Sequence, residues 1–351
     1  MSSQISDPEE SPRRNGRRRR GKESGGAAGS KRVCLAAVAG AAAILTLVSG
    51  FDAVLTASVA EPSRPPERHA VRTDEPLTPI LNVPDPRTAG ALLGERLFAD
   101  PRLSADGSRS CATCHDLGTN GASGRNLDEG LDGAELPLNT STVFNAALSF
   151  RLNWEGAFRT LEDQARATIE NPRIMGSSVE DVVSRLAADP DMVASFRDAY
   201  GREPDTAGLL AALADFERTL VTPDSPFDRW LEGDDGALSA EELEGYEEFK
   251  SLGCAACHQG GNVGGNLFQR HGIFYPLASP EPELLRVPSL RNIETTPPYF
   301  HDGSAPTLEI AVRRMARAQL NSRLTDRQVS SIVAFLRALT GKFRGRQVGA
   351  P

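Results

Sequence analysis

The 351-residue chain is 39% hydrophobic and 25% charged, which excludes a disordered or fibrous protein and allows one large or two ordinary domains. Its 32 glycines and 24 prolines predict a loop-rich structure. The formal net charge is −8, although residues 1–32 hold nine Lys/Arg against four Asp/Glu. The acidic remainder argues against nucleic-acid binding and suits a basic protein partner or none.

The N-terminus carries targeting signals rather than a folded domain. Residues 1–32 form a basic tail, and VCLAAVAGAAAILTLVSGF (33–51) then runs without a charge. This length just reaches a membrane span, and the basic flank predicts a cytoplasmic tail. Because Ser58-Val59-Ala60 also fits a cleavage site, we interpret residues 33–60 as a transmembrane anchor or a removed signal segment. Either way we expect the body on the periplasmic side, anchored in the inner membrane or released. The alternative interpretation of the apolar run is a buried Ala-rich helix.

Residues 61–88 are rich in proline and predict a linker that wraps the body or hangs free. From Ala89 onward helical spacing dominates and no stretch alternates as a strand should, so the body is predicted to be mainly α. Cap residues and apolar periodicity indicate helices within these ranges: 92–98, 178–190, 209–220, 239–253 and 325–341.

The segment Thr222-Pro223-Asp224-Ser225-Pro226 is a cluster of turn residues between two helical blocks. We therefore expect two domains, 89–224 and 225–345. Each contains one Cys-x-x-Cys-His run.

These two runs hold four of the five cysteines: Cys111, Cys114 and His115 in the first, and Cys254, Cys257 and His258 in the second. In such a run the thiols attach covalently to a haem, and the histidine becomes a ligand of its iron. A four-cysteine zinc site is the alternative, but the pairs lie far apart in sequence and both carry the histidine. Two c-type haems are therefore the predicted cofactors.

The second axial ligands are harder to assign. Three further histidines, His69, His271 and His301, and three methionines of the body, Met175, Met192 and Met315, are available. Met315 lies in AVRRMARAQL (311–320), where a thioether would raise the potential of the second haem. From spacing alone it is equally a core residue.

Several strings resemble the bacterial di-haem cytochrome c peroxidases, a family that includes the protein-modifying MauG type. They are LGERLFADPRLSADGSRSCATCH (93–115), NTSTVFNAA (139–147), LNWEGAFRTLEDQA (152–165), VPSLRNIETTPPYFHDG (287–303) and the methionine of AVRRMARAQL. The resemblance covers about residues 90–345. It implies two cytochrome c-like domains with a calcium ion between them and an electron-donor protein as partner.

The resemblance also implies site roles. His115 would bind the iron of the first haem, where hydrogen peroxide reacts, and His258 with Met315 would bind that of the second, which receives electrons. Trp154 matches the tryptophan between the haems, and Gln164 matches the glutamine of the peroxide pocket. The implied calcium ligands are Asn139 and the carbonyls of Thr296 and Pro298, oxygen donors that suit this ion.

Two positions depart from the family pattern. Leu131 occupies the place of a histidine that blocks the first iron in members that need reductive activation, so the first iron is expected to be open, as in the MauG type. Ile174 replaces the acid of the peroxide pocket, and isoleucine cannot transfer a proton. Glu170 and Arg173 are the candidates to replace it, the arginine by stabilising charge on the leaving oxygen.

Three functions remain open. The first is an exported peroxidase that reduces hydrogen peroxide with electrons from a small cytochrome c or cupredoxin. This function is compatible with a homodimer. The second is a MauG-like oxidase of a partner protein, which Leu131 favours and Met315 disfavours, because the MauG type has a tyrosine there. The third is a non-enzymatic di-haem electron carrier, which Ile174 favours.

Overall fold

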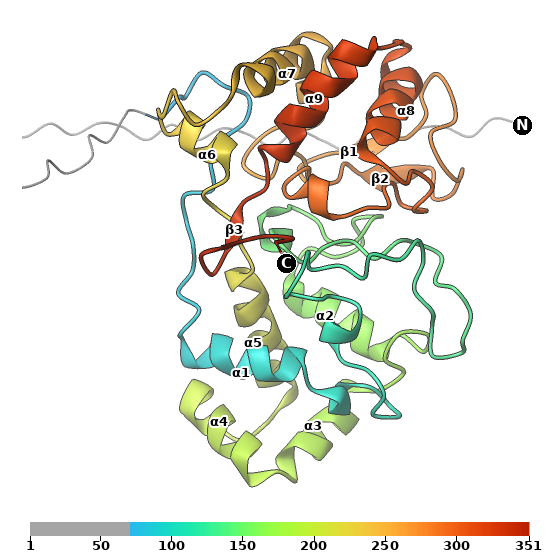
Figure 1. Ribbon diagram of the computed structural model, residues 1–351. Coiled ribbons are helices and arrows are strands. Elements are labelled where there is room, and N and C mark those ends of the chain that lie inside the picture. Colours follow the sequence, from blue (N-terminus) through green and yellow to red (C-terminus); the bar gives the residue numbers. More distant parts are fainter. Residues whose placement is uncertain (1–70, 351) are drawn as a thin grey trace, which may run out of the picture. The chain divides into compact units, whose positions relative to one another are not determined.

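The structure is a computed structural model that describes residues 71–350. This part of the chain is mainly helical, as the sequence predicts (Figure 1). The α-helices are α1 Ala89–Phe98, α2 Leu161–Glu170, α3 Val179–Ala187, α4 Pro190–Tyr200, α5 Thr206–Thr219, α6 Pro226–Leu231, α7 Ala240–Ser251, α8 Leu308–Leu320 and α9 Asp326–Arg337.

The helices begin where the sequence places cap residues. Ser178 accepts a hydrogen bond from the backbone of Asp181 at the start of α3. Ser239 and Glu242 form a reciprocal capping box before α7, and Thr325 forms one with Gln328 before α9. Each cap satisfies backbone N–H groups that the first helical turn leaves without partners.

The mainly α body also contains short strands that the sequence pattern does not reveal. Two short antiparallel pairs are present: β1 Phe268–Arg270 with β2 Leu284–Arg286, and β3 Lys342–Phe343 with β4 Arg346–Gln347. Strands of two or three residues are too short to show alternation in a sequence, which is why the pattern missed them.

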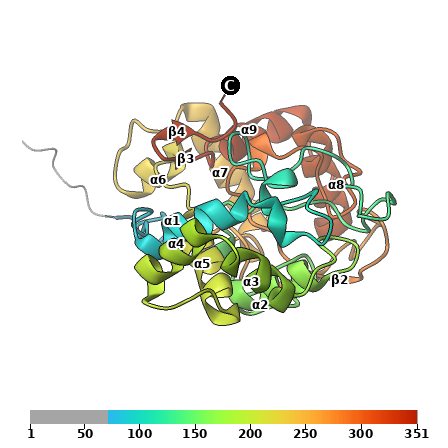
Figure 2. The same ribbon diagram turned by 90° about the horizontal axis from the view of Figure 1, so that it is seen from below.

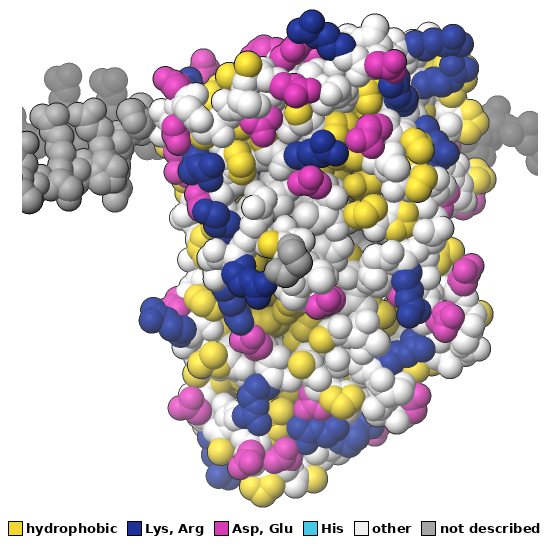
Figure 3. Space-filling view, in the orientation of Figure 1, with side chains coloured by type: hydrophobic (Ala, Val, Ile, Leu, Met, Phe, Trp, Pro, Cys, Tyr) yellow, Lys and Arg dark blue, Asp and Glu magenta, His cyan; other side chains and the backbone are white. Residues whose placement is uncertain are grey.

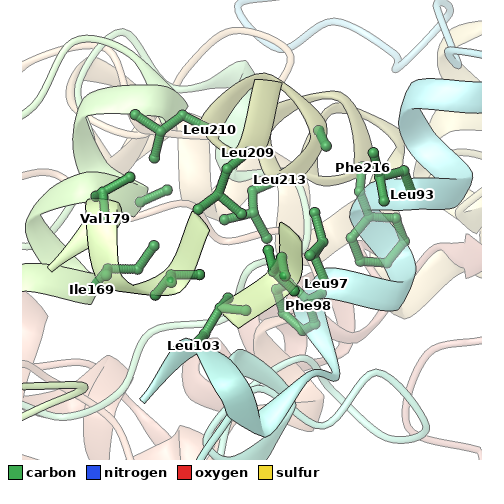
Figure 4. Close-up of a cluster of buried hydrophobic side chains, with 14 of the residues drawn as sticks. Leu93, Leu97, Phe98, Leu103, Ile169, Val179, Leu209, Leu210, Leu213 and Phe216 are labelled. Carbon is green, nitrogen blue, oxygen red and sulfur yellow. The ribbon is translucent and has the colours of Figure 1, made fainter. Parts of the chain in front are cut away.

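A first hydrophobic core gathers α1 to α5, with Leu97, Phe98, Leu213 and Phe216 among its buried side chains (Figure 4). Gly94 lets α1 and α5 approach closely, because a Cβ there would lie 1.9 Å from the carbonyl oxygen of Ala212. Cys111 of the first Cys-x-x-Cys-His run packs against this core.

A second hydrophobic core gathers α6 to α9, which lie above the first group in Figure 1 and behind it in Figure 2. Its centre is an aromatic cluster in which Phe227 contacts Tyr246 and Phe335 with ring centroids 4.8 and 5.1 Å apart. The buried ion pair of Arg291 with Asp228, at 2.7 Å, adds a polar element to this group.

Both ends of the described chain cross to the other group of helices. Near the N-terminal end, Leu77 is buried in the second core, and Arg291 donates to the carbonyl oxygen of Thr78 at 3.0 Å. Near the C-terminal end, Val348 joins the first core and Arg344 pairs with Glu95 of α1. The described end of the proline-rich linker therefore wraps the body.

The two cores meet near the predicted boundary at residues 222–226, between α5 and α6. The division into domains 89–224 and 225–345 stays a prediction, since residues 71–350 belong to one compact unit. The apolar segment 33–51 lies outside the described residues. Among helices of residues 71–350, none has the length and apolar character needed to cross a membrane.

Candidate haem and peroxide site

A cavity of about 680 Å³ is lined by residues from both cores. Both Cys-x-x-Cys-His runs contribute to its wall, as do α2, α5 and α8. One continuous space therefore connects the two positions where the sequence predicts haem attachment.

In the first run, the 3₁₀ turn Cys111–Thr113 folds the chain so that the backbone N–H of His115 donates to the carbonyl oxygen of Cys111 at 3.0 Å. The Nδ1 atom of His115 lies 3.0 Å from the carbonyl oxygen of Gly121. A hydrogen bond there orients the ring and leaves Nε2 as the nitrogen available to a metal. Burial lowers the pKa of His115, which favours the neutral imidazole that a metal requires.

The second run repeats this geometry. The 3₁₀ turn Cys254–Ala256 brings the N–H of His258 to 3.0 Å from the carbonyl oxygen of Cys254. Burial lowers the pKa of His258 to about 4. Its Nδ1 is buried and has no hydrogen-bond partner among the described residues.

The lining suits two covalently attached haems. Its four cysteines form no disulfide within residues 71–350, and burial raises the pKa of Cys111 to about 12 and that of Cys254 to about 11. The thiols of Cys111 and Cys254 are thus half-buried and protonated, and they line the cavity without forming a disulfide. A zinc site would need both pairs around one ion, and no cluster of three or more His, Cys, Asp or Glu ligands exists in the described part.

Arg286 gives an independent indication of the occupant. Its side chain is buried in the cavity wall and donates only to the carbonyls of Asn153 and Val287, at 3.2 and 3.4 Å. No carboxylate of the described residues pairs with it, and burial lowers its pKa. A buried guanidinium requires an anion, and the propionate groups of haem are carboxylates.

Two other predicted residues line the same cavity. Met315 is half-buried on α8, on the wall that also holds His258. Trp154 donates from Nε1 to the carbonyl oxygen of Asn139 at 2.8 Å, and its ring centroid lies 6.2 Å from that of His301. Their assignments as iron ligand and electron relay stay predictions.

The residues predicted to bind calcium also line this cavity. Asn139, Thr296 and Pro298 all line the cavity, and the backbone N–H of Asn139 donates to the carbonyl oxygen of His301 at 2.7 Å. The side-chain nitrogen of Asn139 donates to the carbonyls of Arg125 and Asn126. Its amide oxygen is thereby oriented away from them, but calcium itself stays a prediction.

The peroxide side of the pocket differs from the expected chemistry. Gln164 lines the cavity and donates to the hydroxyl of Thr168 at 3.0 Å. Ile174 also lines it and packs against the first core. Arg173 reaches the wall, but its guanidinium pairs with Asp132 at 3.1 Å and donates to loop carbonyls. Glu170 is exposed, pairs with Arg166 and lies outside the cavity wall, so it does not replace the missing acid.

Leu131 is not part of the cavity wall. Its backbone N–H donates to the carbonyl oxygen of Arg173 at 2.8 Å, and its side chain packs beside Gly176. Sequence reasoning missed two buried charged residues of the wall, Arg286 and Glu217. The signal for Glu217 was present, because it interrupts the apolar face of the helix predicted at 209–220, one turn after Leu213.

The sequence and structure are similar to known proteins. The family model described as di-haem cytochrome c peroxidase matches residues 88–236. The cytochrome c551 peroxidase of Nitrosomonas europaea is 42% identical over 283 residues, covering 76% of this chain and 85% of that protein. The cytochrome c peroxidase Ccp of Escherichia coli is 39% identical, covering 77% of this chain and 62% of that protein. The methylamine utilization protein MauG of Methylorubrum extorquens is 36% identical, covering 70% of this chain and 77% of that protein.

Solved structures show the same fold. A MauG-like protein associated with microbial copper homeostasis superposes with a TM-score of 0.64 at 27% identity, covering 76% of this chain and 93% of that chain. The diheme peroxidase BthA of Burkholderia thailandensis has a TM-score of 0.62 at 19% identity, covering 77% of this chain and 91% of that chain. At that identity the second comparison concerns the fold alone.

Proposed function

This chain belongs to the di-haem cytochrome c peroxidase family and is an oxidoreductase of the cytochrome-c peroxidase type, and from this premise we propose that it reduces hydrogen peroxide to water with electrons from a small redox protein. The donor is a cytochrome c or a cupredoxin. The first haem, on Cys111, Cys114 and His115, is the reactive one, and the second, on Cys254, Cys257 and His258, relays electrons.

The observation that carries this proposal is the shared cavity with a histidine of each run in its wall. When bound, haem iron supplies a site for peroxide and a carrier for single electrons. The chain's own residues provide the rest: His115 and His258 are kept neutral by burial, and Arg286 offers a charge partner. Trp154 is held in the same wall by its hydrogen bond to Asn139.

An exposed apolar patch beside α8 supports a donor-docking site. We define this patch as Ile273, Phe274 and Tyr275, which are 54%, 55% and 40% exposed. The backbone N–H of Phe274 donates to the carbonyl oxygen of Ala318, and the guanidinium of Arg317 lies 4.2 Å from the ring centroid of Tyr275. Loop and helix are thus joined next to Met315.

The charge around this patch differs from that of the whole chain. The α8 residues Arg313, Arg314 and Arg317 are exposed, and only Arg313 pairs with an acid of the described residues, Asp326. Elsewhere acidic and basic side chains are interspersed over the face in Figure 3. An arginine rim selects a donor with an acidic rim. The proposed donor is therefore acidic at its docking face, in contrast to the basic partner that the net charge of the whole chain suggests.

The remaining parts of the proposal come from the sequence. Export to the periplasmic side, through an anchor or a cleaved signal, is supported by the uncharged run at 33–51 after a basic tail. Calcium at Asn139, Thr296 and Pro298 and the division into two cytochrome c-like domains are carried by the family resemblance. A homodimer is compatible with it.

The test is turnover by purified protein that carries two haems. With hydrogen peroxide and a panel of reduced small cytochromes and cupredoxins, at least one donor should be oxidised steadily, in a ratio of two one-electron donors per peroxide. Replacing Cys111 and Cys114 with alanine should remove one haem and all turnover. Oxidation of no donor by the two-haem protein would refute the peroxidase assignment.

A MauG-like oxidase is the second candidate, and one observation favours it: Leu131 stands where a blocking histidine is expected, so the first iron needs no activation. In that case peroxide would change the mass of a protein encoded nearby, without steady donor oxidation. Met315 favours the peroxidase instead, because the MauG type has a tyrosine at that position.

A further inference from the structure

Glu217 is a buried acid in the part of the cavity that belongs to the first haem. It lies in the last turns of α5, is 8% exposed and lines the cavity one helical turn after Leu213, which lines it too. Cys111 of the first run packs against the hydrophobic core that contains Leu213, and both residues line the cavity. This face of α5 therefore borders the first attachment run, and the charge of Glu217 contributes to the raised pKa of Cys111.

The carboxyl of Glu217 has no hydrogen-bond or salt-bridge partner among the described residues. The nearest charges are Glu162 of α2 and its own neighbour Arg218, and these two pair with each other at 2.5 Å. Burial first, and the charge of Glu162 second, raise the pKa of Glu217 to about 8. The group therefore holds a proton at neutral pH and gives it up within the physiological range.

The cavity offers no other buried carboxyl in the described part of the chain. Its second acidic lining residue, Glu155, is exposed to solvent. Gln164 has no acidic proton, Ile174 cannot exchange one, and the guanidinium of Arg173 is engaged with Asp132. Since α2 packs against α5, Glu217 and the lining residues Gln164 and Thr168 face the same space from adjoining helices.

We propose that Glu217 is the proton-exchanging acid of the first haem pocket, replacing the carboxyl that Ile174 has displaced. Reduction of hydrogen peroxide breaks the O–O bond, takes two electrons from the donor protein and two protons, and releases two waters. Glu217 gives one proton to the oxygen that departs as water and recovers it from solvent. The inference rests on the proposed peroxidase function.

Cyanide binding tests the proton exchange without turnover. Hydrogen cyanide must lose its proton to a pocket base when cyanide binds an open haem iron. Glu217 can act as that base only when it is ionised, so the association rate is measured above about pH 8. In the two-haem protein, Glu217→Gln should slow cyanide association at the first haem by about 10²-fold or more, and peroxide consumption by a similar factor. Glu180→Gln, which removes an exposed acid of α3 outside the cavity wall, should change neither rate.

Two further variants separate the role from a structural one. Glu217→Asp keeps an acid and should retain part of the cyanide rate, while Ile174→Glu in the Glu217→Gln background should restore it. Cyanide rates of Glu217→Gln within twofold of the unmodified protein, with both haem spectra intact, would refute the proposal. If the chain is no peroxidase, turnover is absent in every variant, but the cyanide rates still decide the role of Glu217.

Discussion

The indole Nε1 of Trp154 donates a hydrogen bond of 2.8 Å to the main-chain carbonyl of Asn139. The N–H of the same Asn139 donates to the carbonyl of His301, whose ring lies beside the indole. The polar atom of Trp154 is therefore held by a hydrogen bond, and its ring packs edge-on with that of His301. This rigidity is what an electron relay in the cavity wall requires.

Replacing Trp154 with phenylalanine should slow electron transfer between the haems. The variant loses the hydrogen bond to Asn139, at a cost of about 1 kcal/mol in the free energy of unfolding, and the extended indole ring. Stopped-flow spectroscopy of the protein, after selective reduction of the second haem, measures the rate. The control is Trp230→Phe in the second core, which should transfer at the unmodified rate. Equal rates for both variants would remove Trp154 from the relay.

Replacing Met315 with histidine should lower the reduction potential of the second haem, because a thioether ligand favours the reduced iron. Spectroelectrochemistry of the two-haem protein gives both potentials. Met192→Leu changes a buried methionine of the first core that does not line the cavity, and should leave them unchanged. If the second potential is insensitive to the residue at 315, the ligand is another group.

The resting first iron should be open, since Leu131 provides no ligand atom. Electron paramagnetic resonance of the oxidised protein should show one high-spin and one low-spin haem. The side chain at position 131 lies beside Gly176 and outside the cavity wall. Leu131→His should therefore convert the first signal to low spin only if the loop moves so that the histidine enters the cavity. Two low-spin signals in the unmodified protein would contradict an open site.

The sequence predicts α1, α3, α5, α7 and α9 because caps and apolar periodicity are local, whereas α4 and α6 are not among the expected helices. Ser178, Ser239 and Thr325 each start a helix as expected. The crossing of the chain ends was not predictable, since Leu77 and Val348 meet their cores only through long-range packing. No sequence pattern in residues 72–80 or 343–349 indicates which hydrophobic core each segment joins.

The residues of the site also divide into those that the sequence identifies and those that only the fold places. The cysteines and histidines of the haem runs are recognisable because their spacing is part of their chemistry. The position of Arg173 depends on a tertiary contact, because its guanidinium pairs with Asp132 at the cavity wall. Glu170 pairs with Arg166 one turn earlier on α2 and lies outside that wall. Glu217 was visible as an acid on an apolar helix face, but only the fold shows that this face borders the cavity.

Reversing the charge of Arg317 should weaken the use of an acidic donor. Arg317→Glu places a carboxylate beside the exposed patch of Ile273, Phe274 and Tyr275, so kcat/KM for that donor should fall about tenfold at low salt and recover partly at high salt. Arg197→Glu alters an exposed arginine of α4 in the other helix group, outside the cavity wall, and should have little effect. Similar losses in both variants would indicate a general charge effect instead of a docking site.

Glu217 should make the stability of the protein depend on pH. Its pKa is raised from 4.5 to about 8. Below pH 4.5 the carboxyl is therefore protonated in both the folded and the unfolded chain, and its ionisation does not change the free energy of unfolding. As the pH rises from 4.5 to about 8, the unfolded chain loses this proton while the folded chain keeps it. The free energy of unfolding should therefore decrease by about 1.4 kcal/mol per pH unit in this window, relative to Glu217→Gln. Denaturant unfolding of the two proteins across the window measures that difference, and a difference that stays constant with pH would mean that Glu217 is ionised in the folded state.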